Sequence, residues 1–307
     1  MNNAQQMYAL SLDECVTLIG AIGHERTVLM QGDIGNGKSS TLGEVGKLKP
    51  THKRFYVDCT SLDLGDIMIP MIMEVDENSK FVRYVTNEEL GLHTGEPVII
   101  MIDEFGKANP SVKLALLRLI LERKIGSYEL HPESIVYATT NKGSEGVGDM
   151  LPPHARNRMS VVQVRKSTNM EWIEWGINNG IDPTILGWVK DNPQVFADFR
   201  DVKDPNENQY IYHPQAVGRT QFCTPRSFHK LSNIFSKREH LDEHTLTCAA
   251  IGTIGAAAAL DLMAFVKLAN QLPSAESIKT DPLNATVPNN ASAICMVVYR
   301  TLASMDK

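Results

Sequence analysis

The stretch Gly32-Asp33-Ile34-Gly35-Asn36-Gly37-Lys38-Ser39 follows the short run from Thr27 to Met30, with only Gln31 between them. Its spacing fits the P-loop pattern G-x-x-x-x-G-K-[ST], in which a strand leads into a glycine-rich turn and then a helix. The glycines let backbone N–H groups converge on phosphates, Lys38 supplies a mobile cation, and the Ser39 hydroxyl can ligate Mg²⁺. The sequence therefore predicts a site for Mg²⁺ and a nucleoside triphosphate, formed by Gly32, Asp33, Ile34, Gly35, Asn36, Gly37, Lys38, Ser39 and Ser40.

Apolar runs that are typical of strands alternate with helical patterns in the first half of the chain. The run Val98 to Ile102 is apolar at every position, as expected of a strand that is covered on both faces. The alternation predicts an α/β fold in which helices flank both faces of a parallel sheet. The expected strands cover residues 27–30, 54–58, 98–102, 134–140 and 159–164, and the expected helices cover residues 10–22, the segment after the P-loop, and residues 110–125.

Two departures from this alternation suggest how the chain is divided. Residues 62–86 combine apolar runs with Gly65, Pro70 and an acidic turn, which favours a helix interrupted by a hairpin. Methionines within this insertion could form an adaptable contact surface or the core of the hairpin. After residue 166 the pattern becomes mainly helical, with a helix expected at residues 227–235 and loops around residues 191–224 and 272–290. We therefore expect an α/β nucleotide-binding domain at residues 1–166, and a smaller helical lid domain with a C-terminal helical extension at residues 167–307.

Composition limits the range of partners and compartments. The 307 residues, 43% of them hydrophobic, can bury one large core and a smaller one. The net charge of −6 gives no broad electropositive surface, so nucleic acid is an unfavoured partner, although a ring can line a narrow pore with a few cations. The five cysteines lack C-x-x-C spacing, which indicates neither a zinc site nor a disulfide framework and favours a reducing cytoplasm.

Neither a secretory signal nor a membrane span is expected. The N-terminus lacks a basic region followed by an apolar one. The longest apolar stretch, residues 249–266, contains Gly252, Gly255 and Asp261 and is too polar to span a bilayer. We interpret this stretch as a buried helix and expect no membrane partner.

Polar residues follow two of the expected strands. Asp103 and Glu104 end the strand at 98–102, and Asn141 ends the strand at 134–140. Asp103 is the expected Mg²⁺ residue, acting through the water shell of the ion, and Glu104 is the expected general base or water-orienting group. Asn141 could hold the attacking water against the γ-phosphate, although asparagine after a strand is also common turn chemistry.

Taken together, the motifs resemble those of AAA+ ATPases, and within that class the chain is similar to MoxR-like ATPases. The resemblance covers roughly residues 10–235 and implies a homo-oligomeric ring, usually a hexamer, with ATP and Mg²⁺ bound between subunits. It also implies a client protein and a von Willebrand factor A (VWA) domain partner. The matching stretches, in family order, are 32–39, 102–108 followed by 112–117, 121–126, 138–141, 151–159 and 224–226.

The same resemblance assigns roles to three arginines. Arg158 stands where family members carry the finger that contacts the γ-phosphate of a neighbouring subunit, and Arg156 is the close competitor for this role. Arg226, in Thr224-Pro225-Arg226, matches the lid arginine that reaches the nucleotide of its own subunit. The chain departs from the family at Lys107, where relatives often have arginine, and at Phe105-Gly106, which puts any contact from that turn to a neighbour in doubt.

Two other functions use the same core. A nucleic-acid-stimulated motor or helicase loader needs the same P-loop, but the acidic balance and the lack of an appended helix-turn-helix or zinc module weigh against it. A nucleotide switch that does not hydrolyse ATP is disfavoured by the intact Asp103-Glu104 pair.

Overall fold

A five-stranded parallel sheet forms the centre of the first part of the chain. Its strand order is β2-β5-β8-β1-β9, so the P-loop strand β1 lies next to β8, which in turn lies next to β5. This arrangement confirms the predicted α/β class and the parallel sheet. The bounds are β1 (Val28–Gly32), β2 (Lys53–Asp58), β5 (Val98–Asp103), β8 (Ile135–Asn141) and β9 (Ser160–Gln163).

The computed structural model describes residues 8–76, 79–141, 157–269, 272–273, 275–289 and 291–303. The chain divides into two compact units, Met1–Arg165 and Lys166–Lys307. The division falls one residue before the boundary expected from the sequence.

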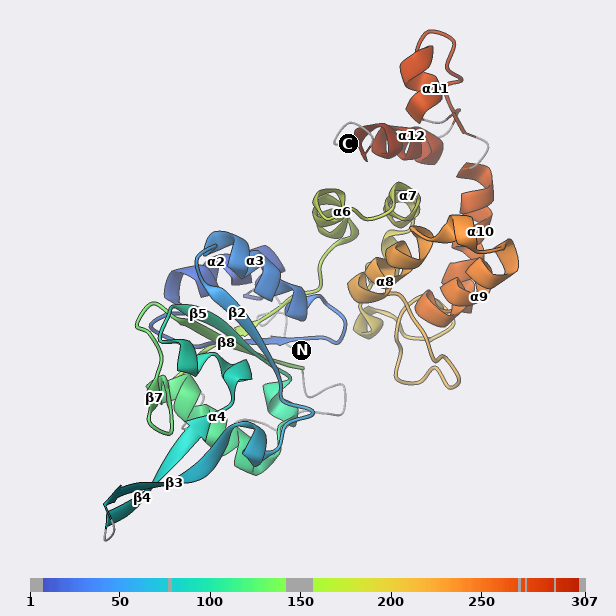
Figure 1. Ribbon diagram of the computed structural model, residues 1–307. Coiled ribbons are helices and arrows are strands. Elements are labelled where there is room, and N and C mark those ends of the chain that lie inside the picture. Colours follow the sequence, from blue (N-terminus) through green and yellow to red (C-terminus); the bar gives the residue numbers. More distant parts are fainter. Residues whose placement is uncertain are drawn as a thin grey trace. The chain divides into compact units, whose positions relative to one another are not determined.

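Helices cover both faces of the sheet, which explains why β5 is apolar from Val98 to Ile102 (Figure 1). Ile99 and Met101 pack in one cluster with residues of α2 (Leu12–Ile22) and α3 (Thr41–Leu48). Ile100 and Ile102 point to the other face and pack in a second cluster with α4 (Pro110–Glu122). Successive side chains of a strand alternate between faces, so an apolar residue is needed at every position.

Helix α4 ends three residues earlier than its apolar pattern suggests. Arg123 adopts a left-handed conformation (φ 60°) and ends the helix, and Lys124–Ile125 (β6) then pairs with Tyr128–Glu129 (β7). Gly126, at φ 58°, makes the turn between them. The expected end at residue 125 is therefore wrong, because a small antiparallel hairpin takes the last two residues.

The insertion at residues 62–86 is mainly a β-hairpin. Strand β3 (Met68–Asp76) pairs with β4 (Ser79–Thr86), and the ribbon extends away from the sheet (Figure 1). The expected helix is reduced to one 3₁₀ turn at Leu64–Asp66. Met68 packs against the core of the first unit, whereas Met71 is 49% exposed.

The second unit is helical. Trp172 and Trp188 both pack against Phe228, which is fully buried. The segment at residues 191–224, expected to be a loop, contains only short 3₁₀ turns, whereas the loop expected at 272–290 contains a short helix. The helices are α6 (Asn169–Asn178), α7 (Pro183–Asp191), α8 (Pro225–Phe235), α9 (Glu243–Ile254), α10 (Ala256–Ala269), α11 (Ala275–Thr280) and α12 (Ala291–Ala303).

The stretch at residues 249–266 is two helices and not the single buried helix expected. Gly255 breaks it with φ 89° and ψ 157°, a backbone region that is essentially restricted to glycine. A Cβ atom at this position would lie 2.6 Å from the carbonyl oxygen of Gln221. Within the described residues, no helix combines the length and the apolar character needed to cross a membrane.

Replacing Gly255 with alanine should destabilise the second unit by about 1–3 kcal/mol, because alanine disfavours this backbone conformation and its Cβ meets Gln221. Gly252→Ala is the matched control, since a Cβ at this α9 position meets no atom within 4 Å. The control should be neutral or stabilising by up to about 1 kcal/mol. Urea unfolding of both variants checks the prediction, and equal stabilities would contradict it.

Candidate functional site

The P-loop connects strand β1 to helix α3 through a tight turn. Gly35 (φ 73°) and Gly37 (φ 82°) both adopt left-handed conformations, which glycine takes at no steric cost. A Cβ atom at Gly37 would also lie 3.1 Å from Leu12. A 3₁₀ turn, Lys38–Ser40, follows and leads into α3. The spacing of glycines in the motif therefore matches the backbone geometry that a phosphate-binding loop requires.

Lys38 joins the P-loop to the neighbouring strand β8. Its ammonium group donates to the carbonyl oxygens of Gly32 (2.9 Å) and Asp33 (2.8 Å), and to Oδ1 of Asn141 (2.9 Å). The residue is only 6% exposed. Two residues predicted separately, Lys38 and Asn141, thus meet at the carboxyl end of the sheet.

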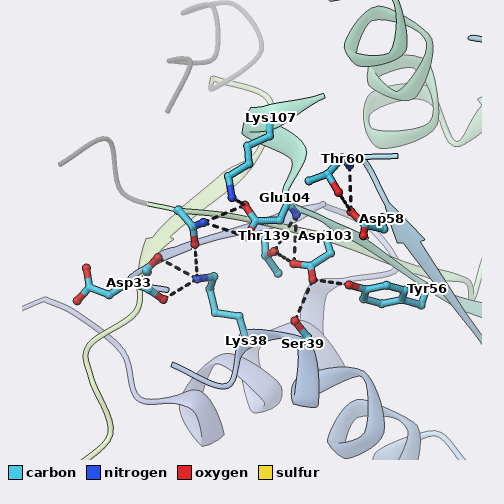
Figure 2. Close-up of polar contacts among 12 residues, drawn as sticks. Asp33, Lys38, Ser39, Tyr56, Asp58, Thr60, Asp103, Glu104, Lys107 and Thr139 are labelled. Carbon is cyan, nitrogen blue, oxygen red and sulfur yellow. Dashed lines mark hydrogen bonds and ion pairs between the residues drawn. The ribbon is translucent and has the colours of Figure 1, made fainter. Parts of the chain in front are cut away.

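Asp103 is the buried carboxylate of the site. Its Oδ2 accepts hydrogen bonds from Ser39 Oγ (2.9 Å) and from the Tyr56 hydroxyl (2.7 Å). Its Oδ1 accepts from the Thr139 hydroxyl and from the backbone N–H of Glu104 (3.1 Å). Figure 2 shows these donors converging from β2, β8 and the start of the P-loop helix.

The donors keep Asp103 ionised despite its burial. Burial alone raises the pKa of this carboxyl, but the hydrogen bonds from Thr139, Tyr56 and Ser39, with the positive charge of Lys38, bring the pKa below its ordinary value. A stable negative charge at this position suits a residue that orders Mg²⁺.

Glu104 is held in an uncommon conformation directly after β5. Its backbone is left-handed (φ 52°, ψ 36°), which is rare for a residue with a side chain. Asn141 donates to both carboxylate oxygens (2.9 and 3.0 Å), and Lys107 forms an ion pair with Oε2 (3.1 Å). Glu104 and Asn141 therefore lie together, and Lys107, noted in the sequence only as a departure from the family, contacts the same carboxylate.

Some predicted P-loop side chains stabilise the loop itself. Asn36 Nδ2 donates to the carbonyl oxygen of Arg165 (2.8 Å), and Ser40 Oγ donates to that of Gly37 (2.6 Å). Ile34 is 45% exposed, whereas Asp33 is buried. The nucleotide contacts expected of these four residues would therefore be made mainly by their backbone groups.

Of the three predicted arginines, Arg158 lies away from this cluster, Arg226 belongs to the second unit, and Arg156 lies outside the described residues. Arg158 is exposed in the turn before β9. Ser160 pairs with Val28 at the start of β1, whereas Gly32 ends this strand. The turn that carries Arg158 therefore lies at the amino end of the strands, roughly 13 Å along β1 from the P-loop end. Arg226 is exposed in the first turn of α8, whose N-terminus is capped by Thr224.

The residues around Ser39 fit a magnesium ion. A hydroxyl and a carboxylate oxygen lie 2.9 Å apart, and both are hard oxygen donors of the kind that Mg²⁺ prefers. In the described parts of the chain, His, Cys, Asp and Glu do not gather in groups of three or more that could hold a metal. Bound Mg²⁺ would therefore need phosphate oxygens and water to complete its shell, as is usual for nucleotide-bound magnesium.

Sequence reasoning missed Tyr56 and Thr139 as partners of Asp103. Ile102 pairs with Ala138 and Tyr56 pairs with Met101, so these residues flank the end of β5. The sequence does place a hydroxyl side chain near the end of each strand that flanks β5, Tyr56 in β2 and Thr139 in β8. Their contacts with Asp103 could be inferred only once the strand order was known.

Comparisons with known proteins give distant structural matches only. No family model matches the chain, and no curated protein matches it. The Saccharomyces cerevisiae Hsp104-ADP complex aligns over 75% of this chain and 36% of that chain, at 15% identity and a TM-score of 0.43. The Thermotoga maritima RuvB Holliday junction branch migration motor aligns over 84% of this chain and 68% of that chain, at 16% identity and a TM-score of 0.41. A point mutant of RuvB aligns over 93% and 84%, at 18% identity and a TM-score of 0.40. Scores of this size carry no argument about activity, so the function must be argued from the site.

The lowered pKa of Asp103 predicts a pH dependence of stability. Because the folded-state pKa lies below the unfolded value of about 3.9, the ionised carboxylate stabilises the fold at pH values above about 4. This stabilisation is lost as the pH falls through the folded-state value. Asp103→Asn should therefore lose stability less steeply than the wild type between about pH 5 and pH 3.

Urea unfolding across this pH range measures the slope. Asp201→Asn, at an exposed position of the second unit, is the control and should keep the wild-type slope. An Asp103→Asn slope equal to that of wild type would contradict the interpretation.

Proposed function

We propose that this chain is a Mg²⁺-dependent ATP hydrolase of the AAA+ type. The observation that carries the proposal is the convergence of three pairs at one edge of the sheet: Lys38 with Asn141, Ser39 with Asp103, and Glu104 with Asn141. A P-loop alone indicates phosphate binding. A buried carboxylate beside the P-loop serine, with a second carboxylate next to it, supports hydrolysis as well.

In this proposal the P-loop binds the triphosphate. Its backbone N–H groups and the start of α3 face the phosphates, and Lys38 exchanges its carbonyl partners for phosphate oxygens. Ser39 and Asp103 would hold Mg²⁺, which neutralises charge on the β- and γ-phosphates when it is bound.

Glu104 would orient the attacking water and accept its proton. Asn141 contacts both Glu104 and Lys38, so it can set the distance between the water-orienting carboxylate and the phosphate-binding cation. Lys107 also restrains the Glu104 carboxylate through its ion pair with Oε2. Phosphoryl transfer depends mainly on positioning and charge, and this network supplies positioning.

A neighbouring subunit would complete the site. Arg158 lies near the amino end of the sheet strands, whereas the P-loop lies at their carboxyl end. It therefore cannot reach the phosphates of its own subunit but is available to those of another. This placement favours a ring in which Arg158, or Arg156 beside it, acts as the trans finger. Arg226 would contact the nucleotide from the helical unit.

The motif resemblance further favours a MoxR-like ring, with a hexamer as the expected size, that remodels a client protein together with a VWA-domain partner. The alternative is a nucleic-acid-stimulated motor or helicase loader. The net charge of −6 argues against the alternative. Measuring the ATPase rate with and without single-stranded DNA separates the two, since only the alternative predicts stimulation.

Lys38→Ala should abolish nucleotide binding, because it removes the cation at the phosphates. Lys47→Ala is the control, since Lys47 is an exposed residue of α3 that pairs with Glu44. Titration calorimetry with ATP and Mg²⁺ should give at least a ~100-fold weaker affinity for Lys38→Ala and an unchanged affinity for the control. Wild-type affinity in Lys38→Ala would refute the proposed phosphate site.

Arg158→Ala and Glu104→Gln should each bind nucleotide but lose turnover by about 100-fold or more. The two substitutions are expected to inactivate different sites, because Glu104 acts in the site of its own subunit and Arg158 acts in the site of the neighbouring subunit. Mixing the two inactive variants should therefore restore part of the activity, since some interfaces then combine an intact Glu104 with an intact Arg158. Lys38→Ala should also restore activity to Arg158→Ala, because it supplies an intact Arg158 to that variant's site. It should not restore Glu104→Gln, because that mixture has no site with both an intact Lys38 and an intact Glu104.

Two results would count against this assignment. Full turnover in Arg158→Ala would move the finger to Arg156. Inactive mixtures at every ratio, with rings still formed, would refute catalysis shared between subunits.

A further inference from the structure

Asp103 is held from both sides of its strand. Thr139 donates from β8 to Oδ1, and Tyr56 donates from β2 to Oδ2. Ser39 donates to Oδ2 as well, so this oxygen has two hydroxyl partners at 2.7 and 2.9 Å. Oδ2 is therefore the oxygen that connects the tyrosine to the serine of the P-loop.

The sheet register explains why a tyrosine can make this contact. Tyr56 pairs with Met101, two residues before Asp103, and both lie on the α3 face of the sheet with the Asp103 side chain. Two residues along a strand correspond to about 6.6 Å, so the donor must be at the end of a long side chain. The phenol of Tyr56 covers this offset, as Figure 2 shows.

We propose that Tyr56 is a positioning residue for Mg²⁺ and acts through Asp103. This inference rests on the proposed function. Ser39 would hold Mg²⁺ through its hydroxyl oxygen while its O–H donates to Oδ2 of Asp103, and the hydrogen bond from Tyr56 would keep that carboxylate oxygen in place. Groups that orient metal-site ligands in this way usually contribute about 10–100-fold to metal affinity or activity.

Tyr56 differs from the other donors in its exposure. Thr139 is fully buried, whereas Tyr56 is 48% exposed on the edge strand and lines an open hollow with Lys53, Glu89 and His93. Removing the Tyr56 hydroxyl leaves the ring in place and creates no cavity in the core. Tyr56→Phe therefore tests the hydrogen bond without disturbing the packing that supports the sheet.

The test compares nucleotide binding with and without the metal. ADP is titrated into wild type and Tyr56→Phe in EDTA, and then at increasing Mg²⁺. In EDTA the two affinities should be equal, because the P-loop is unchanged. The Mg²⁺ concentration that gives half of the full increase in affinity should be about 10-fold higher in the variant. ATPase assays should show the same shift, with kcat recovering at saturating Mg²⁺.

Tyr84→Phe is the matched control, because Tyr84 is 44% exposed on the hairpin, away from Asp103. It should keep the wild-type Mg²⁺ dependence. An unchanged Mg²⁺ dependence in Tyr56→Phe, or an equal loss of affinity in EDTA and in Mg²⁺, would overturn the inference while leaving the proposed function intact. A wild-type chain that binds no nucleotide under either condition would refute the proposed function, and this inference with it.

Discussion

The site depends on one buried negative charge. Asp103 is 5% exposed, and an ionised carboxylate is tolerated there only because donors occupy both of its oxygens. These donors come from β2, β8 and the start of the P-loop helix, so the charge can be satisfied only when the three elements are assembled. Fold and site are thus linked through the electrostatics of a single side chain.

A second constraint acts one residue later. The left-handed backbone of Glu104 costs on the order of 1–3 kcal/mol, and such strain persists where surrounding contacts determine the conformation. Asn141 and Lys107 supply those contacts. With this turn the second carboxylate lies against Asn141 at the end of β8, which also contacts the P-loop lysine. Asp103 and Glu104 are neighbours in sequence, yet the change in backbone direction gives them different partners.

Local patterns predicted much of this arrangement. The P-loop with the strand before it and the helix after it is one contiguous stretch, and the Asp103-Glu104 pair at the end of β5 is another, so the chemistry of each could be inferred without knowing the fold. The contacts of Asp103 with Tyr56 and Thr139 could not be inferred in the same way, because they depend on which strands lie side by side. The early end of α4 at Arg123 and the break at Gly255 were missed for a related reason. In both places the apolar pattern continues, and the backbone changes direction to satisfy pairing or packing elsewhere in the unit.

The position of β2 has a consequence for how the protein loses function. In the sheet described here, β2 is an outermost strand and pairs only with β5. Outer strands are the usual places where local opening begins, well below the free energy of global unfolding. Fraying of this strand would withdraw the phenol from Asp103 while β5, β8 and β1 stay together. Gentle warming should then weaken the proposed Mg²⁺ site before circular dichroism registers any melting, and amide exchange along residues 53–58 should report the same early event.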